Sequence, residues 1–348
     1  MHARPAIVTS FKMVDRLSDA VSVLLLALSI LLFVPVQCFG QAAPTSVTST
    51  MTEQQLLNQF KRIEGRGTLP DVRSYVLEQP GGRTWRTFHD VYLRWIAVVA
   101  IFGILATLAA YYLWHGTIRF EGGWSGRKML RFTAYERFVH WLTAVSFFVL
   151  AITGLNFTFG KEVLLPLMGP EAFSAWAGAA KYAHNFTSFS FTLGILLMFL
   201  IWVLNNLPQR VDIEWLRSGG GMFGGKEPPT GRFNTGEKFI FWMSVFAGTI
   251  VSASGYVLLF PFWGTGIETV QLVQVVHSVV AMLFIAGMLV HMYMGTIGTE
   301  GAFDSMISGE VDVNWAKSHH SLWYAEEMAR GSGNRSQAGA RPKNRRTA

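Results

Sequence analysis

The sequence has 348 residues, of which 51% are hydrophobic and only 15% are charged, with a formal net charge of +7. Because the apolar residues come in long uninterrupted runs, this composition predicts an integral membrane protein rather than a soluble domain. The basic excess indicates membrane topology and attraction to anionic lipid, and nothing in it suggests nucleic-acid binding. With Cys38 as the only cysteine, the chain can hold neither a disulfide framework nor an iron–sulfur cluster by itself.

The N-terminal region predicts a cleavable signal peptide over residues 1–40. Three basic residues precede the apolar run VSVLLLALSILLFVPV, and the small residues Cys38 and Gly40 follow it. This order is typical of a secretory signal, and an uncleaved anchor helix is the alternative. Residues 41–89 are polar, with turn signals at TLPD and QPGG, and are expected to form a small exported segment without assigned chemistry.

Five apolar runs then predict five transmembrane helices, each close to the roughly 20 residues that cross the hydrocarbon core. The first, within residues 90–115, stands apart from the other four, which form a helical domain over 130–300 followed by a tail at 301–348. The runs lie at 91–114, 139–157, 185–204, 239–260 and 270–297. None of them contains Asp or Glu away from its ends, which argues against an ion-coupled transporter that relays protons through histidines. No inverted repeat is visible either.

The loop charges predict the orientation. The connections at 115–137, 159–182, 205–238 and 261–269 hold five, two, five and no Lys or Arg residues, and the tail beyond 299 holds seven. Rich and poor connections alternate, so the first, the third and the tail are expected in the cytoplasm. This places the mature N-terminus outside the cytoplasm and the C-terminus inside it.

The last run carries two histidines, His277 and His291, in VVHSVVAMLFIAGMLVHMYM. Fourteen residues of helix separate their rings by about 21 Å and return them to within about 40° of the same face. Ionisable residues inside a membrane helix are costly and usually functional. One helix face therefore presents two candidate ligands at two depths.

Matching by depth predicts their partners. His140, in YERFVHW, lies near the cytoplasmic end of its span, at the predicted depth of His291. His184, in KYAHNFTS, lies near the exported end of its span, at the predicted depth of His277. Two imidazole pairs across a helix bundle are what two bis-histidine b-type haems require. Zinc would want cysteine or carboxylate neighbours, and Met292 and Met294 beside His291 do not face one copper ion.

The remaining histidines are weaker candidates. His89 and His115 bracket the first span, where amphipathic rings are common, and are expected to be structural. His319 and His320 are expected to lie too far beyond the last span to reach an iron inside the membrane.

The histidine motifs, together with VVHSVVA, LVHMYM and the tail NWAKSHHSLWYAEE, resemble the γ subunit, a cytochrome b, of membrane-bound respiratory formate dehydrogenase. The resemblance covers residues 131–328. It implies an all-α membrane protein of the bacterial inner membrane, with a four-helix core holding two b haems. It further implies that electrons pass from a catalytic (alpha) subunit through an exported iron–sulfur (beta) subunit to this chain, and from this chain to quinone near the cytoplasmic face. No formate-oxidising site is then expected on this chain. The signal, the segment 41–89 and the first span are additional to that core.

The same resemblance places the quinone pocket at the turn in GRFNTGEKFIFW, with Asn234 as a donor to a quinone carbonyl and Glu237 as a proton relay. An ordinary turn and helix start is the alternative for both residues. For the whole chain, the alternatives are the cytochrome b of a membrane hydrogenase or thiosulfate reductase, and a haem-free membrane anchor.

Overall fold

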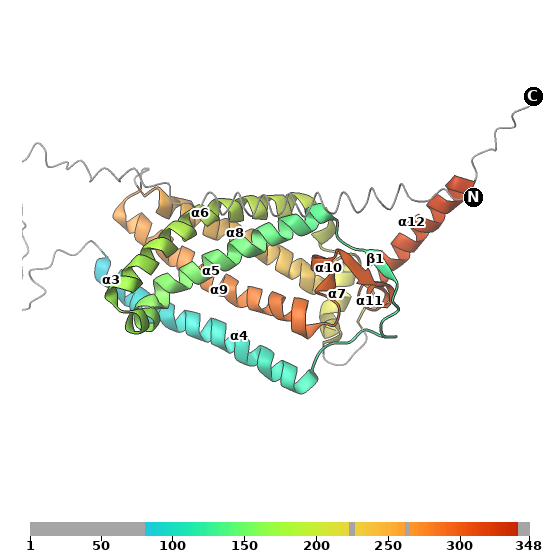
Figure 1. Cartoon of the computed structure of the whole chain (residues 1–348), viewed down its shortest axis with the longest axis horizontal. Coiled ribbons are helices and arrows are strands. Elements are labelled where there is room, and N and C mark those ends of the chain that lie inside the picture. Colours follow the sequence, from blue (N-terminus) through green and yellow to red (C-terminus); the bar gives the residue numbers. More distant parts are fainter. Residues whose placement is uncertain (1–80, 223–226, 262–264, 340–348) are drawn as a thin grey trace, which may run out of the picture. The chain divides into compact units, whose positions relative to one another are not determined.

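The computed structural model describes residues 81–222, 227–261 and 265–339. The predicted signal peptide at 1–40, and all but the last residues of the predicted segment at 41–89, lie outside this described part. The described chain is almost entirely helical (Figure 1). It begins with the short helix α3 (Gly82–Thr87), which passes into a π-helical stretch, η3 (Phe88–Leu93).

Five of the described helices are long and apolar enough to cross a membrane, as the sequence predicts. They are α4 (Arg94–His115), α5 (Ala134–Met168), α6 (Pro170–Trp202), α8 (Thr235–Leu259) and α9 (Ile267–Tyr293). A π-helical stretch, η6 (Met294–Gly298), continues α9. The all-α membrane fold with one span added before a four-helix core is therefore confirmed.

The second and third spans are longer than their apolar runs. The predicted connection at 159–182 is helical, because α5 continues to Met168 and α6 starts at Pro170. The chain reverses at Gly169, whose φ of 78° is the left-handed region that glycine adopts readily, and Pro170 suits the first helical turn. Lys161 and Glu162 interrupt the apolar run in α5, so hydropathy ends the predicted span before them although the helix continues.

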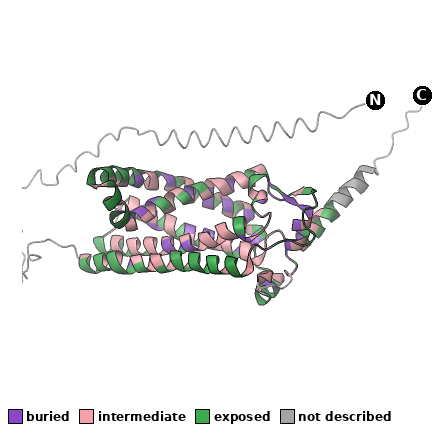
Figure 2. Cartoon of the chain, turned by 60° about the horizontal axis from the view of Figure 1, so that its bottom comes forward, coloured by how far each residue is buried: buried purple, intermediate pink, exposed green. Residues whose placement is uncertain are grey.

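The core lies between α5, α6, α8 and α9, where Val139, Phe191, Phe241 and Phe284 are buried. A Cβ added at Gly194 would meet Thr143, so small residues allow close helix approach, as is common in membranes. The added helix α4 packs through Ala97 on Met282 of α9. Exposed residues lie along the outer faces (Figure 2), and many of them are large and apolar, as contact with lipid requires.

Short elements gather where α5 and α8 begin and α9 ends, an end of the bundle that we call the tail side. They are η4 (Val203–Asn206), α7 (Arg210–Arg217), η5 (Gly219–Gly221), α10 (Asp304–Ile307), α11 (Val313–His319) and α12 (Ser321–Gly339), with two strands, β1 (Lys128–Leu130) and β2 (Glu310–Asp312). The strands pair antiparallel, with Lys128 opposite Asp312. This pairing joins the connection before α5 to the tail.

Candidate functional site

The four intramembrane histidines form two facing pairs. His140 of α5 faces His291 of α9 with their ring centroids 6.2 Å apart, and His184 of α6 faces His277 of α9 at the same 6.2 Å. We call these the tail-side pair and the turn-side pair, the latter because it lies toward the reversal of the chain at Gly169. The structure thus brings together the partners that depth matching predicts. Their role as iron ligands stays a prediction.

The spacing within each pair fits two imidazoles on one metal ion. Bonds from a metal to imidazole nitrogen are about 2 Å long, so two opposed nitrogens lie about 4 Å apart and the ring centroids behind them about 6 Å apart. Within the described residues, no three His, Cys, Asp or Glu side chains converge as a metal site. The donor set at each depth is therefore two neutral nitrogens from different helices, which suits axial ligation of a haem iron.

Hydrogen bonds fix which nitrogen of the turn-side rings faces inward. Thr153 Oγ1 lies 2.8 Å from His184 Nδ1, and Ser254 Oγ lies 3.0 Å from His277 Nδ1. Each hydroxyl donates its proton to a carbonyl one turn earlier on its own helix, at 2.6 Å in both cases. Each hydroxyl can therefore only accept from the ring, so Nδ1 carries the proton and Nε2 keeps the lone pair that a metal needs.

The tail-side pair is held differently. His140 Nδ1 is buried and has no hydrogen-bond partner within the part of the chain that the structure describes. Its ring instead packs edge-on against Trp141, with centroids 5.3 Å apart. Trp141 in turn donates to the carbonyl oxygen of Met306 at 3.0 Å, which ties this end of α5 to the segment after α9. Packing rather than hydrogen bonding thus surrounds this imidazole.

The two predicted quinone residues form the start of α8. Asn234 is the N-cap, with its side-chain oxygen accepting from the Glu237 backbone N–H at 2.9 Å, and Glu237 accepts from the Asn234 N–H at 3.0 Å. The Asn234 side-chain nitrogen points to Glu227 Oε1 at 3.5 Å. Both residues therefore have the helix-start role that the sequence leaves open.

An ion pair between buried Arg131 and half-buried Glu237 joins the start of α8 to the start of the core. Arg131 donates to both carboxylate oxygens of Glu237, at 2.9 and 3.1 Å, and to the carbonyl of Arg232 at 3.0 Å. The Arg131 side chain is 2% exposed and that of Glu237 is 35% exposed. The guanidinium also lies over the ring of Trp315, 4.8 Å from its centroid, which adds a cation–π contact from the tail.

A second pair of charges lies beside the first, where Lys238 Nζ donates to both oxygens of Asp212, at 2.9 and 3.0 Å. Burial alone would raise the pKa of Asp212, but the hydrogen bond from Lys238 and those from Gln209 and Thr235 outweigh it, so that pKa lies below its usual value. The short helix α7 is thereby fixed to the first turn of α8.

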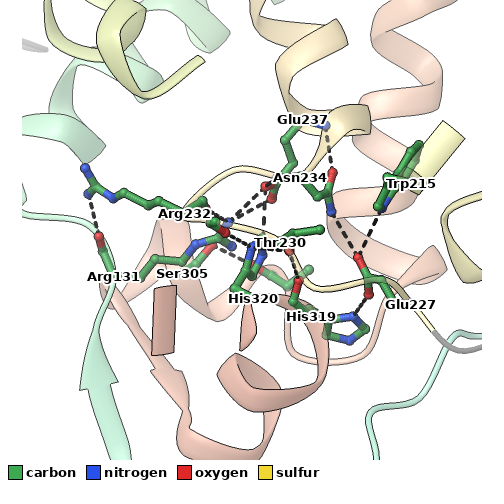
Figure 3. A network of polar contacts seen from close by, with 12 residues as sticks. Arg131, Trp215, Glu227, Thr230, Arg232, Asn234, Glu237, Ser305, His319 and His320 are labelled. Atoms are coloured by element: carbon green, nitrogen blue, oxygen red, sulfur yellow. Dashed lines mark hydrogen bonds and ion pairs between the residues drawn. The ribbon is translucent and has the colours of Figure 1, made fainter. Parts of the chain in front are cut away.

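The tail histidines His319 and His320, which the sequence predicts to lie too far beyond the last span to reach an iron inside the membrane, are buried at this end of the bundle (Figure 3). His320 donates through Nδ1 to the carbonyl of Gly231 at 2.9 Å, and its Nε2 lies 3.8 Å from Glu237. Burial, followed by the nearby charge of Arg131, lowers the pKa of His320 to about 3, so the ring is neutral at physiological pH. In the sequence, only the motif WAKSHHSLWYAEE distinguishes the surroundings of His320.

His319 completes a row of polar groups that ends at the predicted pocket. Its Nδ1 lies 2.6 Å from Glu227 Oε2, and the other oxygen of Glu227 faces Asn234, as Figure 3 shows. His319 Nε2 is buried without a hydrogen-bond partner among the described residues. Of the two outer histidines, His89 contacts Asp90 at 2.9 Å and His115 stacks on Tyr111 with centroids 5.3 Å apart, in keeping with structural roles.

Known proteins similar to this chain are cytochrome subunits. It is 30% identical over 202 residues to the formate dehydrogenase cytochrome b556(fdo) subunit of Escherichia coli K12, covering 57% of this chain and 92% of that protein. It is 27% identical over 209 residues to the nitrate-inducible b556(Fdn) subunit of the same strain, covering 58% and 93%. The cytochrome b556 subunit of Haemophilus influenzae formate dehydrogenase is 27% identical over 207 residues, covering 58% and 84%. Residues 131–309 match the family described as prokaryotic cytochrome b561, and the chain belongs to that family.

Proposed function

We propose that this chain is the cytochrome b subunit of a formate dehydrogenase in a bacterial inner membrane, and that it carries electrons across the membrane to quinone. The observation that carries this proposal is the pair of facing imidazoles at each of two depths, on a chain that belongs to a cytochrome family. The likeness to formate dehydrogenase subunits supports an iron–sulfur subunit, with the catalytic subunit behind it, as the partner that supplies the electrons.

In this proposal, His140 with His291 and His184 with His277 hold the irons of two b haems. Bound there, haem supplies one-electron oxidation and reduction within the hydrocarbon core. The chain's own contribution is geometric: α9 presents one ring at each depth, about 21 Å apart along its axis, which spans most of a core about 30 Å thick. Apolar residues of the four helices pack beside the tail-side pair, where Val139 adjoins His140 and Met288 lies one turn before His291.

The test is a count of haems by pyridine haemochrome analysis of the purified protein. The native chain is expected to hold two haems, and His277→Ala is expected to hold one. The remaining haem should be spectrally unchanged because its ligands belong to the other pair, His140 and His291. His89→Ala, which removes a histidine outside both pairs, is the matched control and should keep two. One haem or none in the native chain would refute the proposal.

The electron donor is tested in the intact complex in native membranes. Formate is expected to reduce both haems. Reduction by hydrogen and not by formate would assign the chain to the alternative, a hydrogenase cytochrome b, without changing the haem sites. A chain with no haem absorbance at all would be a membrane anchor only.

Asn234 and Glu237 are proposed to line the quinone pocket on the tail side, with the Asn234 amide donating a hydrogen bond to a quinone carbonyl and Glu237 relaying a proton. Because Asn234 also caps α8, Asn234→Ala would remove the cap and the donor together. Asn234→Ser keeps a capping oxygen and removes only the amide donor. Asn234→Ser is therefore expected to slow quinone reduction while both haems remain present and reducible by formate. A native rate in this variant would show that Asn234 is a cap residue only.

A further inference from the structure

The two rings of the turn-side pair are backed by the same two-residue arrangement on two different helices. Thr153 and Gly154 of α5 lie behind His184, and Ser254 and Gly255 of α8 lie behind His277. In each case a hydroxyl binds Nδ1, and the glycine that follows it lies against the ring. Neither α5 nor α8 supplies a ring to this pair, so these helices contribute its support.

The glycines set how closely each ring approaches the neighbouring backbone. A Cβ added at Gly255 would lie 3.3 Å from His277 Cε1 and 3.7 Å from its Nδ1, and one added at Gly154 would lie 3.6 Å from His184 Cε1. The first distance is tighter than ordinary van der Waals contact and the last is within it. A side chain at 255 would therefore push His277 away from Ser254, whereas one at 154 would only touch His184.

The hydroxyls set the electronic character of the rings. The Thr153 and Ser254 protons are committed to the carbonyl oxygens of Val149 and Ile250, so each hydroxyl offers only a lone pair to the imidazole. A ring that donates from Nδ1 becomes a more basic ligand through Nε2, and a more basic ligand stabilises the oxidised, more positive iron. His140 of the tail-side pair has no such acceptor at Nδ1 within the described residues.

We propose that Thr153 and Ser254 are positioning residues that hold His184 and His277 as Nε2 ligands and lower the reduction potential of the turn-side iron below that of the tail-side iron. This inference rests on the proposed function, since it requires haem at both pairs. The step that it governs is a one-electron exchange in which one iron is oxidised, the other is reduced, and no bond forms or breaks. The difference in hydrogen bonding directs that electron from the turn side to the tail side.

The experiment is a redox titration of the visible absorbance of the intact complex, carried out after the haem count. Thr153→Val and Ser254→Ala are expected to keep two haems and to raise one of the two midpoint potentials, leaving the other unchanged. A tenfold shift in the reduction equilibrium, which is about 59 mV for one electron, is the expected size of the change. Thr107→Val on α4, whose hydroxyl also binds the carbonyl one turn earlier but no histidine, is the matched control and should move neither potential.

Conservative exchanges separate positioning from simple packing. Thr153→Ser and Ser254→Thr keep the acceptor and should retain the native potentials. If Thr153→Val loses a haem and Thr153→Ser keeps it, the hydroxyl positions the ligand, as proposed. Two retained haems with unshifted potentials, or a haem lost in both Thr153 variants, would overturn the inference. A native complex with fewer than two haems would instead refute the proposed function itself.

Discussion

Replacing Glu237 by Gln tests whether the ion pair with Arg131 fastens the tail side of the bundle. The substitution keeps the shape of the side chain and its capping contact with Asn234, because Gln also serves at this position of a capping box. It removes the charge opposite Arg131, whose side chain is 2% exposed, and replaces one of the two oxygens that accept from Arg131 by an amide nitrogen. The experiment therefore measures the cost of leaving a buried guanidinium without its counter-charge and with one acceptor fewer.

The magnitude follows from the burial of the two partners. Breaking a fully buried pair costs about 3–5 kcal/mol and an exposed pair about 0–1 kcal/mol. Because Arg131 is buried while Glu237 is 35% exposed, water can partly replace the lost carboxylate, and we expect about 2–3 kcal/mol. In a chain of 348 residues that lowers Tm by about 3–4 °C.

The assay is thermal denaturation of the detergent-purified protein with its haem content matched to the native protein. Glu310→Gln, an exposed carboxylate on β2, is the control and should leave Tm unchanged. Equal Tm values for Glu237→Gln and Glu310→Gln would show that the Arg131 pair does not stabilise this end of the bundle. The reasoning from burial would then be wrong.

Two further predictions concern pH and orientation. The pKa of His320 is lowered to about 3 from an unfolded value of about 6.5, so its contribution to stability is complete above pH 6.5 and is lost as the pH falls toward 3. The difference in unfolding free energy between the native protein and His320→Gln should therefore shrink by about 1 kcal/mol from pH 7.5 to pH 5.5. An unchanged difference over that range would contradict the buried neutral state. A reporter active only outside the cytoplasm, fused after Gly126, should be inactive because Arg119, Arg127 and Lys128 lie in that connection, and strong activity would reverse the predicted topology.

The pairing of the histidines was predictable because two regular features determine it. Helix periodicity places His277 and His291 on one face of α9, and the alternating direction of successive spans places His184 and His140 at their depths. Both arguments need only the order and length of the helices. Periodicity also places Gly154 fourteen residues after His140, on the same face of α5 and at the depth of the other pair.

The supports of the site were less accessible from the sequence. Thr153 and Ser254 bind histidines on neighbouring helices 31 and 23 residues away, and hydroxyl residues are also common in membrane helices as local partners of carbonyl groups. His320 reaches Gly231 across 89 residues, through a tail whose path depends on the pairing of β1 with β2. No periodic pattern encodes contacts of this range, so only the folded chain reveals them.

The two histidine pairs thus differ in the contacts that hold their rings in place. The turn-side pair is held by the hydroxyls of Thr153 and Ser254, which lie on the neighbouring helices α5 and α8 and are themselves bonded to backbone carbonyls inside the bundle. The tail-side pair lies toward the end where Arg131, Glu237 and His320 join the starts of two helices to the tail, and these contacts are polar. Polar contacts can exchange with water and protons, whereas a packed apolar core cannot. Quinone reduction takes up protons as well as electrons, so the proposed quinone pocket is better placed beside these polar contacts than beside the turn-side pair, whose hydroxyl partners are already bonded to backbone carbonyls.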